Sequence, residues 1–388
     1  MMNTPRPAPA GFARPVALKP ANSAKRAIKI VLGIFASLIG LLLGLIVLLL
    51  IGFETGPVPF LIGLVTATVP VPLYLILVLW IDRYEAEPFW MLATAFFWGA
   101  LIAVFFAIII NTISGEAVAM MTDSAQAGHT FGAVVSAPIV EEIAKALILF
   151  IFFFLKKDEF DGVIDGIVYA GMVGLGFAMT ENILYYGKAV ISPNVGLLFV
   201  FILRGALAPF SHPMFTSFTG IGLGLARQTR NMAVKWIAPP LGLLAAISMH
   251  SIWNGSGALF GGGAFILTYI VIMIPAFFIM LVVIALGLRR EGQLVREHLA
   301  PDFKGGLLTQ KEYNQLCTIT GRMGSSFNAF SRGGLGHWQA ARQLNQTASE
   351  LAFHRSRVAR GICAADAHER EAAYRLALEN LLRQLRAT

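Results

Sequence analysis

Charged residues are scarce in this sequence, and their scarcity excludes an ordinary water-soluble domain. Only 13% of the 388 residues are charged and 56% are hydrophobic, whereas soluble domains contain about a quarter charged residues. Apolar runs of at least about 18 residues recur along the chain, and such runs are typical of transmembrane helices. The composition therefore predicts an all-α, polytopic bundle of membrane helices.

Cysteine is also rare, with Cys317 and Cys363 as its two copies. Both lie outside the apolar region, so they do not indicate a disulfide scaffold, and they suit a reducing cytoplasm. The net charge of +8 collects in the two tails and in alternate loops rather than over a soluble domain. We therefore expect the lipid bilayer as a partner and no nucleic acid.

About eight apolar segments can be distinguished. The first is too long for the apolar region of a signal peptide, so we interpret it as a retained span. The sixth is long enough to be tilted, kinked at Pro209 and Pro213, or partly interfacial. The segments cover residues 30–53, 58–81, 89–113, 130–155, 163–186, 195–225, 236–255 and 263–288.

Lysine and arginine in the short loops predict the orientation of these segments. With the N-terminus inside, the inner loops carry Arg83, Lys156, Lys157 and a basic cluster at 227–235, whereas the outer loops contain only Lys188. An even number of spans returns the C-terminus to the same side. We therefore expect both termini in the cytoplasm.

Three regions follow from this pattern. Residues 1–29 form a basic tail that we expect to be disordered, residues 30–288 form the transmembrane domain, and residues 289–388 form a cytosolic helical tail. Within the last region, residues 337–360 and 364–386 have the spacing of amphipathic helices.

Several polar residues lie at the predicted depth of the membrane, where each charge costs at least about 2.5 kcal/mol and usually faces a cavity or a partner. The fourth segment contains Glu141, Glu142 and Lys145. Their spacing of three and four residues places both carboxylates near the ammonium on a helix. The fifth segment contributes Glu181 and Asn182. A structural ion pair that fixes helix packing is the plain alternative for the first group.

Two histidines belong to later segments. His212 lies in the sixth, and His250 shares a helical face with Asn254 in the seventh. Because the segments alternate in direction, the glutamates and histidines all fall between the middle of the bilayer and its outer half. We therefore expect one shared site, whose candidate catalytic residues are Glu141, Glu142, Lys145, Glu181, Asn182, His212, His250 and Asn254.

Such a set of residues can hydrolyse an amide in two ways. In the first, a glutamate of the Glu141–Glu142 pair activates water directly, and a histidine or the asparagine stabilises the oxyanion. In the second, His212, His250 and Glu181 hold a zinc ion with an open position, and Glu142 is the base. The first is favoured because the glutamate pair beside a lysine makes a base without a metal. The sequence does not separate the two, so Zn²⁺ stays open as a cofactor.

Other designs of intramembrane protease are excluded by missing motifs. The sequence contains neither HExxH, as in site-2 zinc proteases, nor GxGD, as in aspartyl designs. A rhomboid-type GxSG is also missing, because Asn254 stands where its first glycine is required.

Four motifs in order resemble the PrsW family of intramembrane proteases, which is related to CAAX-prenyl endopeptidase-type membrane proteins. The EExxK pattern matches residues 141–145, FxxxEN matches 177–182, and the later histidine patterns match His212 and the HxxWN-like run 250–254. The stretch Asp-Arg-Tyr-Glu-Ala-Glu-Pro at 82–88 also resembles a segment common in this family.

The resemblance covers about residues 60–290. It implies an endopeptidase that cleaves a single-span or membrane-proximal protein, with anti-sigma factors as the best-known substrate class. We expect the protein in the inner (cell) membrane of a bacterium. A proton- or ion-coupled transporter is the main alternative, because membrane carboxylates and histidines also mark ion pathways, although the inverted repeats of many transporters are not evident. A non-catalytic membrane scaffold is the third.

Overall fold

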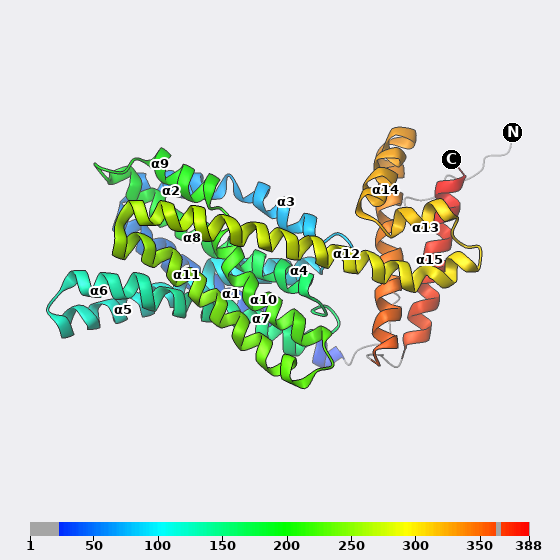
Figure 1. The fold of residues 1–388 in the computed structure, drawn as a ribbon, viewed down its shortest axis with the longest axis horizontal. Coiled ribbons are helices and arrows are strands. Elements are labelled where there is room, and N and C mark those ends of the chain that lie inside the picture. Colours follow the sequence, from blue (N-terminus) through cyan, green and yellow to red (C-terminus); the bar gives the residue numbers. More distant parts are fainter. Residues whose placement is uncertain (1–22, 362–365, 388) are drawn as a thin grey trace. The chain divides into compact units, whose positions relative to one another are not determined.

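The computed structural model describes residues 23–361 and 366–387, and every regular element within them is a helix (Figure 1). This confirms the predicted all-α membrane bundle. Most of the tail expected to be disordered, residues 1–29, lies outside the described residues. Its last part differs from the expectation, because the first helix already begins at Ser23.

The chain divides into two compact units, of which the first is Ser37–Gly292 and the second is Gln293–Thr388 grouped with Met1–Ala36. We call Ser37–Gly292 the membrane unit and Gln293–Thr388 the C-terminal unit. Elements marked η are π-helical turns. The helices up to the end of the membrane region are α1 (Ser23–Thr55), α2 (Pro57–Thr68), α3 (Val71–Ile81), α4 (Phe89–Phe97), η1 (Trp98–Ala103), α5 (Val104–Thr122), α6 (Ala125–Phe131), η2 (Gly132–Ser136), α7 (Ala137–Leu155), α8 (Val163–Ile191), α9 (Leu197–Phe201), η3 (Ile202–Leu207), α10 (Ser211–Gln228), α11 (Met232–Thr268), η4 (Tyr269–Met273) and α12 (Ile274–Lys304).

Six helical stretches are long and apolar enough to cross a membrane, compared with about eight predicted segments. Helix α7 is not among them, because it carries the charged residues Glu141, Glu142 and Lys145. The predicted seventh and eighth segments lie within one stretch, in which Gly261 interrupts the helix with a φ of 78°. Glycine tolerates this left-handed conformation because it lacks a Cβ. The six stretches are Val31–Thr55, Pro57–Ile81, Phe89–Thr122, Val163–Ile191, Leu197–Gln228 and Met232–Lys304.

Helix α8 is buried along nearly its whole length and lies in the middle of the membrane unit. It packs against α10, α2, α4 and η1. A Cβ on Gly166 would lie 2.1 Å from the carbonyl oxygen of Gly220, and one on Gly174 would lie 2.5 Å from the nitrogen of Pro213. Small residues let membrane helices approach closely. The glycines therefore bring α8 and α10, which carry polar residues of the fifth and sixth segments, into backbone contact.

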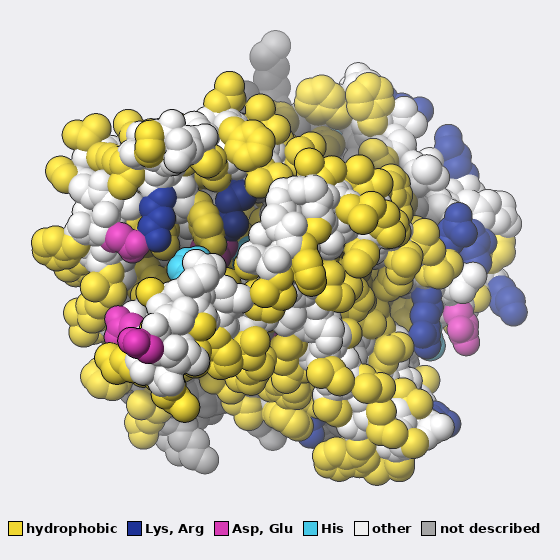
Figure 2. All heavy atoms as spheres, turned by 60° about the vertical axis from the view of Figure 1, so that its left-hand side comes forward, with side chains coloured by type: hydrophobic (Ala, Val, Ile, Leu, Met, Phe, Trp, Pro, Cys, Tyr) yellow, Lys and Arg dark blue, Asp and Glu magenta, His cyan; other side chains and the backbone are white. Residues whose placement is uncertain are grey.

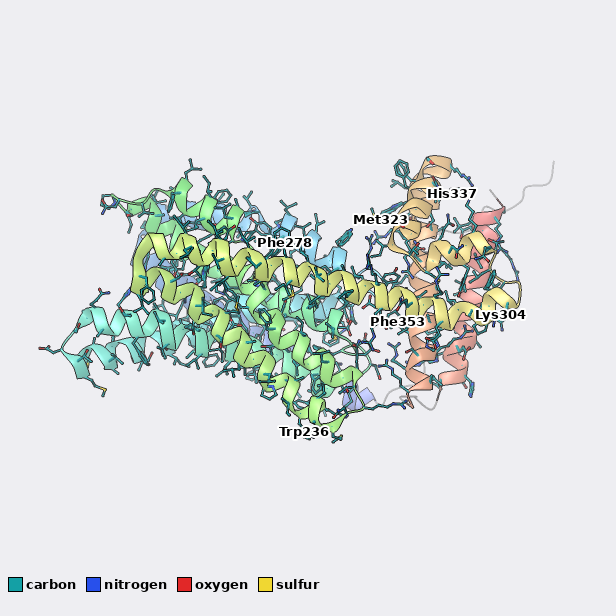
Figure 3. The ribbon with its side chains drawn as sticks, viewed as in Figure 1. Trp236, Phe278, Lys304, Met323, His337 and Phe353 are labelled. Carbon is teal, nitrogen blue, oxygen red and sulfur yellow. The ribbon has the colours of Figure 1, made fainter. Side chains whose placement is uncertain are left out.

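The outer surface of the membrane unit is apolar. Figure 2 shows hydrophobic side chains over most of the visible face, with a few charged groups between them. Trp236 and Phe278 project away from the helices that carry them, with exposed fractions of 73% and 60% (Figure 3). A soluble protein rarely exposes large apolar patches, whereas hydrocarbon favours them. This surface fits contact with lipid.

The C-terminal unit contains the end of α12 and three further helices: α13 (Gln310–Leu316), α14 (Ile319–Ala359) and α15 (Ala367–Arg386). Helix α14 is interrupted at Gly333 and Gly334, and it packs against both α13 and α15. The predicted amphipathic helices correspond to the second part of α14 and to α15. Buried apolar residues such as Leu351 and Leu382 form the core of this unit.

Candidate active site

Helix α7 carries the first part of the polar cluster. Pro138 lies near its start, directly after the π-helical turn η2. One turn later, Glu141, Glu142 and Lys145 all point to the buried side of the helix. The Lys145 Nζ atom is 2.7 Å from Oε1 of Glu142 and 3.7 Å from Oε2 of Glu141. The predicted proximity of both carboxylates to the ammonium is therefore present in the structure.

The carboxylate of Glu142 is fully buried and joins three helices. Its Oε1 accepts a hydrogen bond from Lys145 and lies 3.0 Å from Nδ1 of His250 on α11. Its Oε2 accepts a hydrogen bond of 2.9 Å from the hydroxyl of Thr216 on α10. Three donors hold this side chain in one orientation.

The Lys145 ammonium lies at the centre of the cluster, also with no exposed surface. Besides the two carboxylates of α7, it lies 3.1 Å from Nδ1 of His212 on α10. It also sits 4.1 Å from the centroid of the Phe177 ring, a cation–π contact. An unpaired charge in this environment would be very costly, and the neighbouring carboxylates offset that cost.

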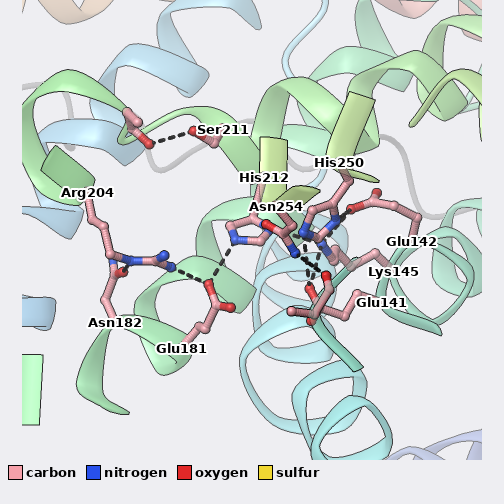
Figure 4. Close-up of polar contacts among 12 residues, drawn as sticks. Glu141, Glu142, Lys145, Glu181, Asn182, Arg204, Ser211, His212, His250 and Asn254 are labelled. Carbon is pink, nitrogen blue, oxygen red and sulfur yellow. Dashed lines mark hydrogen bonds and ion pairs between the residues drawn. The ribbon is translucent and has the colours of Figure 1, made fainter. Parts of the chain in front are cut away.

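Glu181 and Asn182, on α8, bind an arginine. The guanidinium of Arg204, on the π-helical turn η3, donates from Nε to Oδ1 of Asn182 at 2.6 Å and from Nη2 to Oε2 of Glu181. The same Glu181 oxygen lies 2.9 Å from Nε2 of His212. The carboxylate of Glu181 therefore links Arg204 to His212, as Figure 4 shows.

The carboxylate contacts determine which ring nitrogen of each histidine keeps a lone pair. An ionised carboxylate can only accept, so Nδ1 of His250 donates to Glu142 and Nε2 of His212 donates to Glu181. In the neutral rings, the lone pairs are then on Nε2 of His250 and Nδ1 of His212. Both rings lie close together, with centroids 5.1 Å apart.

Glu141 completes a set of three possible metal ligands. One ligand atom from each of Glu141, His212 and His250 can be chosen so that all three lie within 4.8 Å of one another, and all three residues are buried. Among the described residues, Oε2 of Glu141 is buried without a hydrogen-bond partner. Two imidazoles and one carboxylate are the donor set of many catalytic zinc sites. The residues present therefore fit a metal ion.

This set differs from the ligands expected from the sequence. Glu181 was the expected carboxylate ligand beside His212 and His250, but its oxygen binds Arg204 and His212. Glu141 is the carboxylate that lies near the two histidines, because α7 points its side chain toward them. Sequence spacing cannot distinguish these carboxylates, since both lie at the same depth.

Asn254 lies in the cluster but makes a different contact from the one expected for an oxyanion donor. Its amide nitrogen donates to the carbonyl oxygen of Ala133 at 3.0 Å. Ala133 belongs to η2, which leads directly into α7. Asn254 thereby ties α11 to the start of the helix that carries the glutamate pair.

Two residues of the cluster, Arg204 and Thr216, could not be assigned a role from the sequence. An arginine at membrane depth is itself a signal of function, and Thr216 lies one helical turn after His212, on the same face. Their partners could not be derived, because these depend on how η3 and α10 are rotated against α8.

Comparisons with known proteins agree with this geometry. A model of the family described as PrsW family intramembrane metalloprotease matches residues 87–280, which is half of the chain. The chain belongs to the PrsW family. The family that the motifs indicated is therefore confirmed, together with its setting as an intramembrane protease, and the transporter alternative has no support among these matches.

Several proteins named Protease PrsW are similar in sequence. The protein of Oceanobacillus iheyensis is 30% identical over 193 residues, which cover 50% of this chain and 82% of that protein. The Bacillus subtilis protein is 32% identical over 174 residues, covering 45% and 72%. The Geobacillus kaustophilus protein is 34% identical over 146 residues, covering 38% of this chain but only 58% of that protein. No solved structure matches the chain.

Proposed function

We propose that the chain hydrolyses peptide bonds of membrane-anchored proteins, and that Glu141, His212 and His250 hold the metal ion of this reaction. The observation that carries the ligand set is the buried Oε2 of Glu141, which has no hydrogen-bond partner among the described residues and lies within reach of both histidines. The description of the family as metalloproteases supports it. When bound, the metal supplies a Lewis acid that polarises the scissile carbonyl and makes water a stronger acid.

The remaining residues of the cluster then have separate roles. Glu142 takes the proton from the attacking water and returns it to the leaving amide nitrogen. Lys145 and Thr216 keep that carboxylate ionised and oriented. Asn254 positions the start of α7 through Ala133. Glu181 and Asn182, with Arg204, orient His212.

The substrate is a single-span or membrane-proximal protein. The depth of the glutamates and histidines in the membrane unit supports cleavage within or next to the bilayer. Anti-sigma factors are the substrate class that the family resemblance suggests. We further propose that residues 30–288 form the protease domain and that residues 289–388 form a cytosolic helical domain.

The proposed membrane topology places both termini in the cytoplasm of a bacterial cell with the protein in its inner membrane. The bias of lysine and arginine toward one set of loops supports this orientation. A reporter active only in the cytoplasm, fused after Thr388, should give a signal. Activity from an extracytoplasmic reporter at the same position would reverse the orientation.

Metal analysis of the full-length protein in nanodiscs tests the ligand set. After exposure to Zn²⁺ and removal of excess ion, the wild type should retain about one ion per chain, and a strong chelator should abolish cleavage of a membrane-anchored substrate reversibly. Glu141→Gln should retain almost none. The matched change Glu181→Gln should retain the ion with affinity about 10–100-fold weaker, as for loss of a residue that orients a ligand.

The opposite result distinguishes the two mechanisms. If cleavage survives chelation, and Glu141→Gln binds as much zinc as wild type, the metal proposal is wrong. Glu142-activated water without a metal then explains the activity, provided that Glu142→Gln is inactive in the same assay.

A further inference from the structure

A small cavity lies beside the polar cluster, between α2, α3, α8 and η3. Most of its wall is apolar, but four polar side chains line it: Tyr74, Asn182, Tyr186 and Arg204. All the elements that line it belong to stretches long and apolar enough to cross the membrane. A polar cavity at this depth is costly unless its groups find partners.

The hydroxyl of Tyr186 is the unexplained group in this cavity. Tyr186 has no exposed surface, and its hydroxyl has no hydrogen-bond partner among the described residues. Gly205 faces it, and a Cβ at that position would lie only 3.0 Å from the Tyr186 oxygen. The absence of a side chain at 205 leaves the space in front of the hydroxyl open. A second wall residue, Tyr74, donates a hydrogen bond to the carbonyl oxygen of Gly205 and so holds this segment in place.

The cavity has the properties of a water site. Its size suits about one water molecule, which needs two to four polar partners. The Tyr186 hydroxyl, the Arg204 guanidinium and the Asn182 carboxamide are the available partners. An apolar occupant would leave the Tyr186 hydroxyl unsatisfied, and such a loss costs about 1–3 kcal/mol.

The cavity also borders the catalytic cluster. Arg204 lines the cavity and donates to Glu181, which contacts His212. Glu142 and Lys145, by contrast, have no exposed surface. Hydrolysis consumes one water for each bond cut: the C–N bond breaks, the hydroxyl joins the carbonyl carbon, and the proton goes to the amide nitrogen. A buried site therefore needs a route by which water arrives.

We propose that this cavity, between α2, α3, α8 and η3, binds water in the membrane and supplies it to the catalytic cluster past Arg204. Only the second part of this inference, that the water is consumed in the reaction, rests on the proposed function. Hydration of the cavity itself can be measured without any proteolysis.

Oxidation of an introduced thiol by hydrogen peroxide, in the full-length protein in nanodiscs, tests the hydration. In a chain whose cysteines are replaced (Cys317→Ala, Cys363→Ala), Ala178→Cys places a thiol in the cavity wall. Ala170→Cys is the matched control, because Ala170 lies on the same helix, is fully buried and does not line the cavity. Hydrogen peroxide, whose molecule is close to water in size, should oxidise the thiol at position 178 at least about tenfold faster than the thiol at position 170, since only the thiolate reacts and it forms where water is present.

A lipid-facing control tests whether a thiol that is exposed only to lipid also reacts quickly. Leu73→Cys lies on α3 with a large exposed fraction but outside the cavity wall, so it should react as slowly as position 170. Equal rates of oxidation at positions 178 and 170, in proteins with unchanged thermal unfolding, would overturn the proposal. Such a result would make the cavity a dry pocket.

The supply of water to the reaction is tested separately. Gly205→Ala fills the space in front of the Tyr186 hydroxyl, and Tyr186→Phe removes the hydroxyl. Each should lower kcat by about tenfold while KM and zinc content stay as in wild type. A rise in KM at unchanged kcat would contradict the water role and indicate a pocket for a substrate side chain. If no substrate is cleaved by wild type, the oxidation experiment still decides whether the cavity is hydrated. Failure of the proposed function can therefore be distinguished from failure of the hydration proposal.

Discussion

The membrane unit and the C-terminal unit each bury an ionic cluster, but the two clusters differ in how completely their charges are paired. In the C-terminal unit, the carboxylate of Asp302 is bound by Arg355 and lies 3.3 Å from Nε of Arg375. Arg355 also binds Glu371. The side chain of Arg375 is 51% exposed, so this cluster borders water on one side.

The centre of the cluster in the membrane unit has no such exposed partner. Glu142 and Lys145 are fully buried, and Glu141 keeps one oxygen without a hydrogen-bond partner among the described residues. Burying ion pairs is a weak source of stability, because desolvation can exceed the Coulombic gain. A cluster that retains an unsatisfied carboxylate is therefore better explained by chemistry, whereas the satisfied cluster at Asp302 is explained by structure.

The largest expected difference between the clusters is in activity. Glu142→Gln keeps the shape of the side chain but removes the charge that accepts the proton, so cleavage should fall by about a thousandfold. The matched change in the other cluster, Asp302→Asn, should leave the cleavage rate close to that of wild type. Both variants are compared on the same membrane-anchored substrate after their thermal unfolding is checked. If both variants lost cleavage to a similar extent, the cluster at Glu142 would have no greater role in the reaction than the cluster at Asp302.

The next difference is in stability. Asp302→Ala leaves the partly buried Arg355 without its main partner, so the free energy of unfolding of the C-terminal unit should fall by about 3 kcal/mol. Arg375→Ala removes a half-exposed partner and should cost less than about 1 kcal/mol. Denaturant unfolding, followed by a probe in α14 of the full-length protein, measures both. Equal costs would show that Asp302 does not depend on the buried arginine.

The smallest effect concerns a carboxyl at the edge of the membrane unit. Asp82 follows the second membrane stretch and accepts a hydrogen bond from the backbone N–H of Glu87 at 2.8 Å. Burial raises the pKa of Asp82 to about 7, from 3.8. The folded state thus holds the proton more tightly, so the stability contributed by neutral Asp82 is complete below pH 3.8 and is lost as pH rises to about 7.

Asp82→Asn should remove this pH dependence. Between pH 4 and 7, the wild type should lose stability relative to the variant with a slope of up to about 1 kcal/mol per pH unit. The difference in thermal unfolding between the two proteins, measured at several pH values, gives the slope. A constant difference would mean that Asp82 titrates alike in the folded and unfolded chains.

Much of the architecture could be predicted because it depends on composition along the chain. The length of the apolar runs predicts helices that cross a bilayer, and the depth of Glu141, Glu142, Glu181, His212 and His250 predicts that they meet. The number of spans was harder to predict. The charged residues within α7 and the break at Gly261 change where a membrane-crossing helix begins and ends.

The amino-acid sequence by itself determined that this protein is a helical membrane bundle with its glutamates and histidines at one depth, because hydrophobic length and spacing are local properties. Only the tertiary structure decided which carboxylate faces which partner: Glu181 binds Arg204 and His212, and Glu142 binds Lys145 and His250. Among the described residues, Glu141 keeps one oxygen without a hydrogen bond. These choices depend on how each helix is rotated about its own axis. That rotation is set by close backbone contacts between helices, such as Gly166 against Gly220, which join residues far apart in the chain.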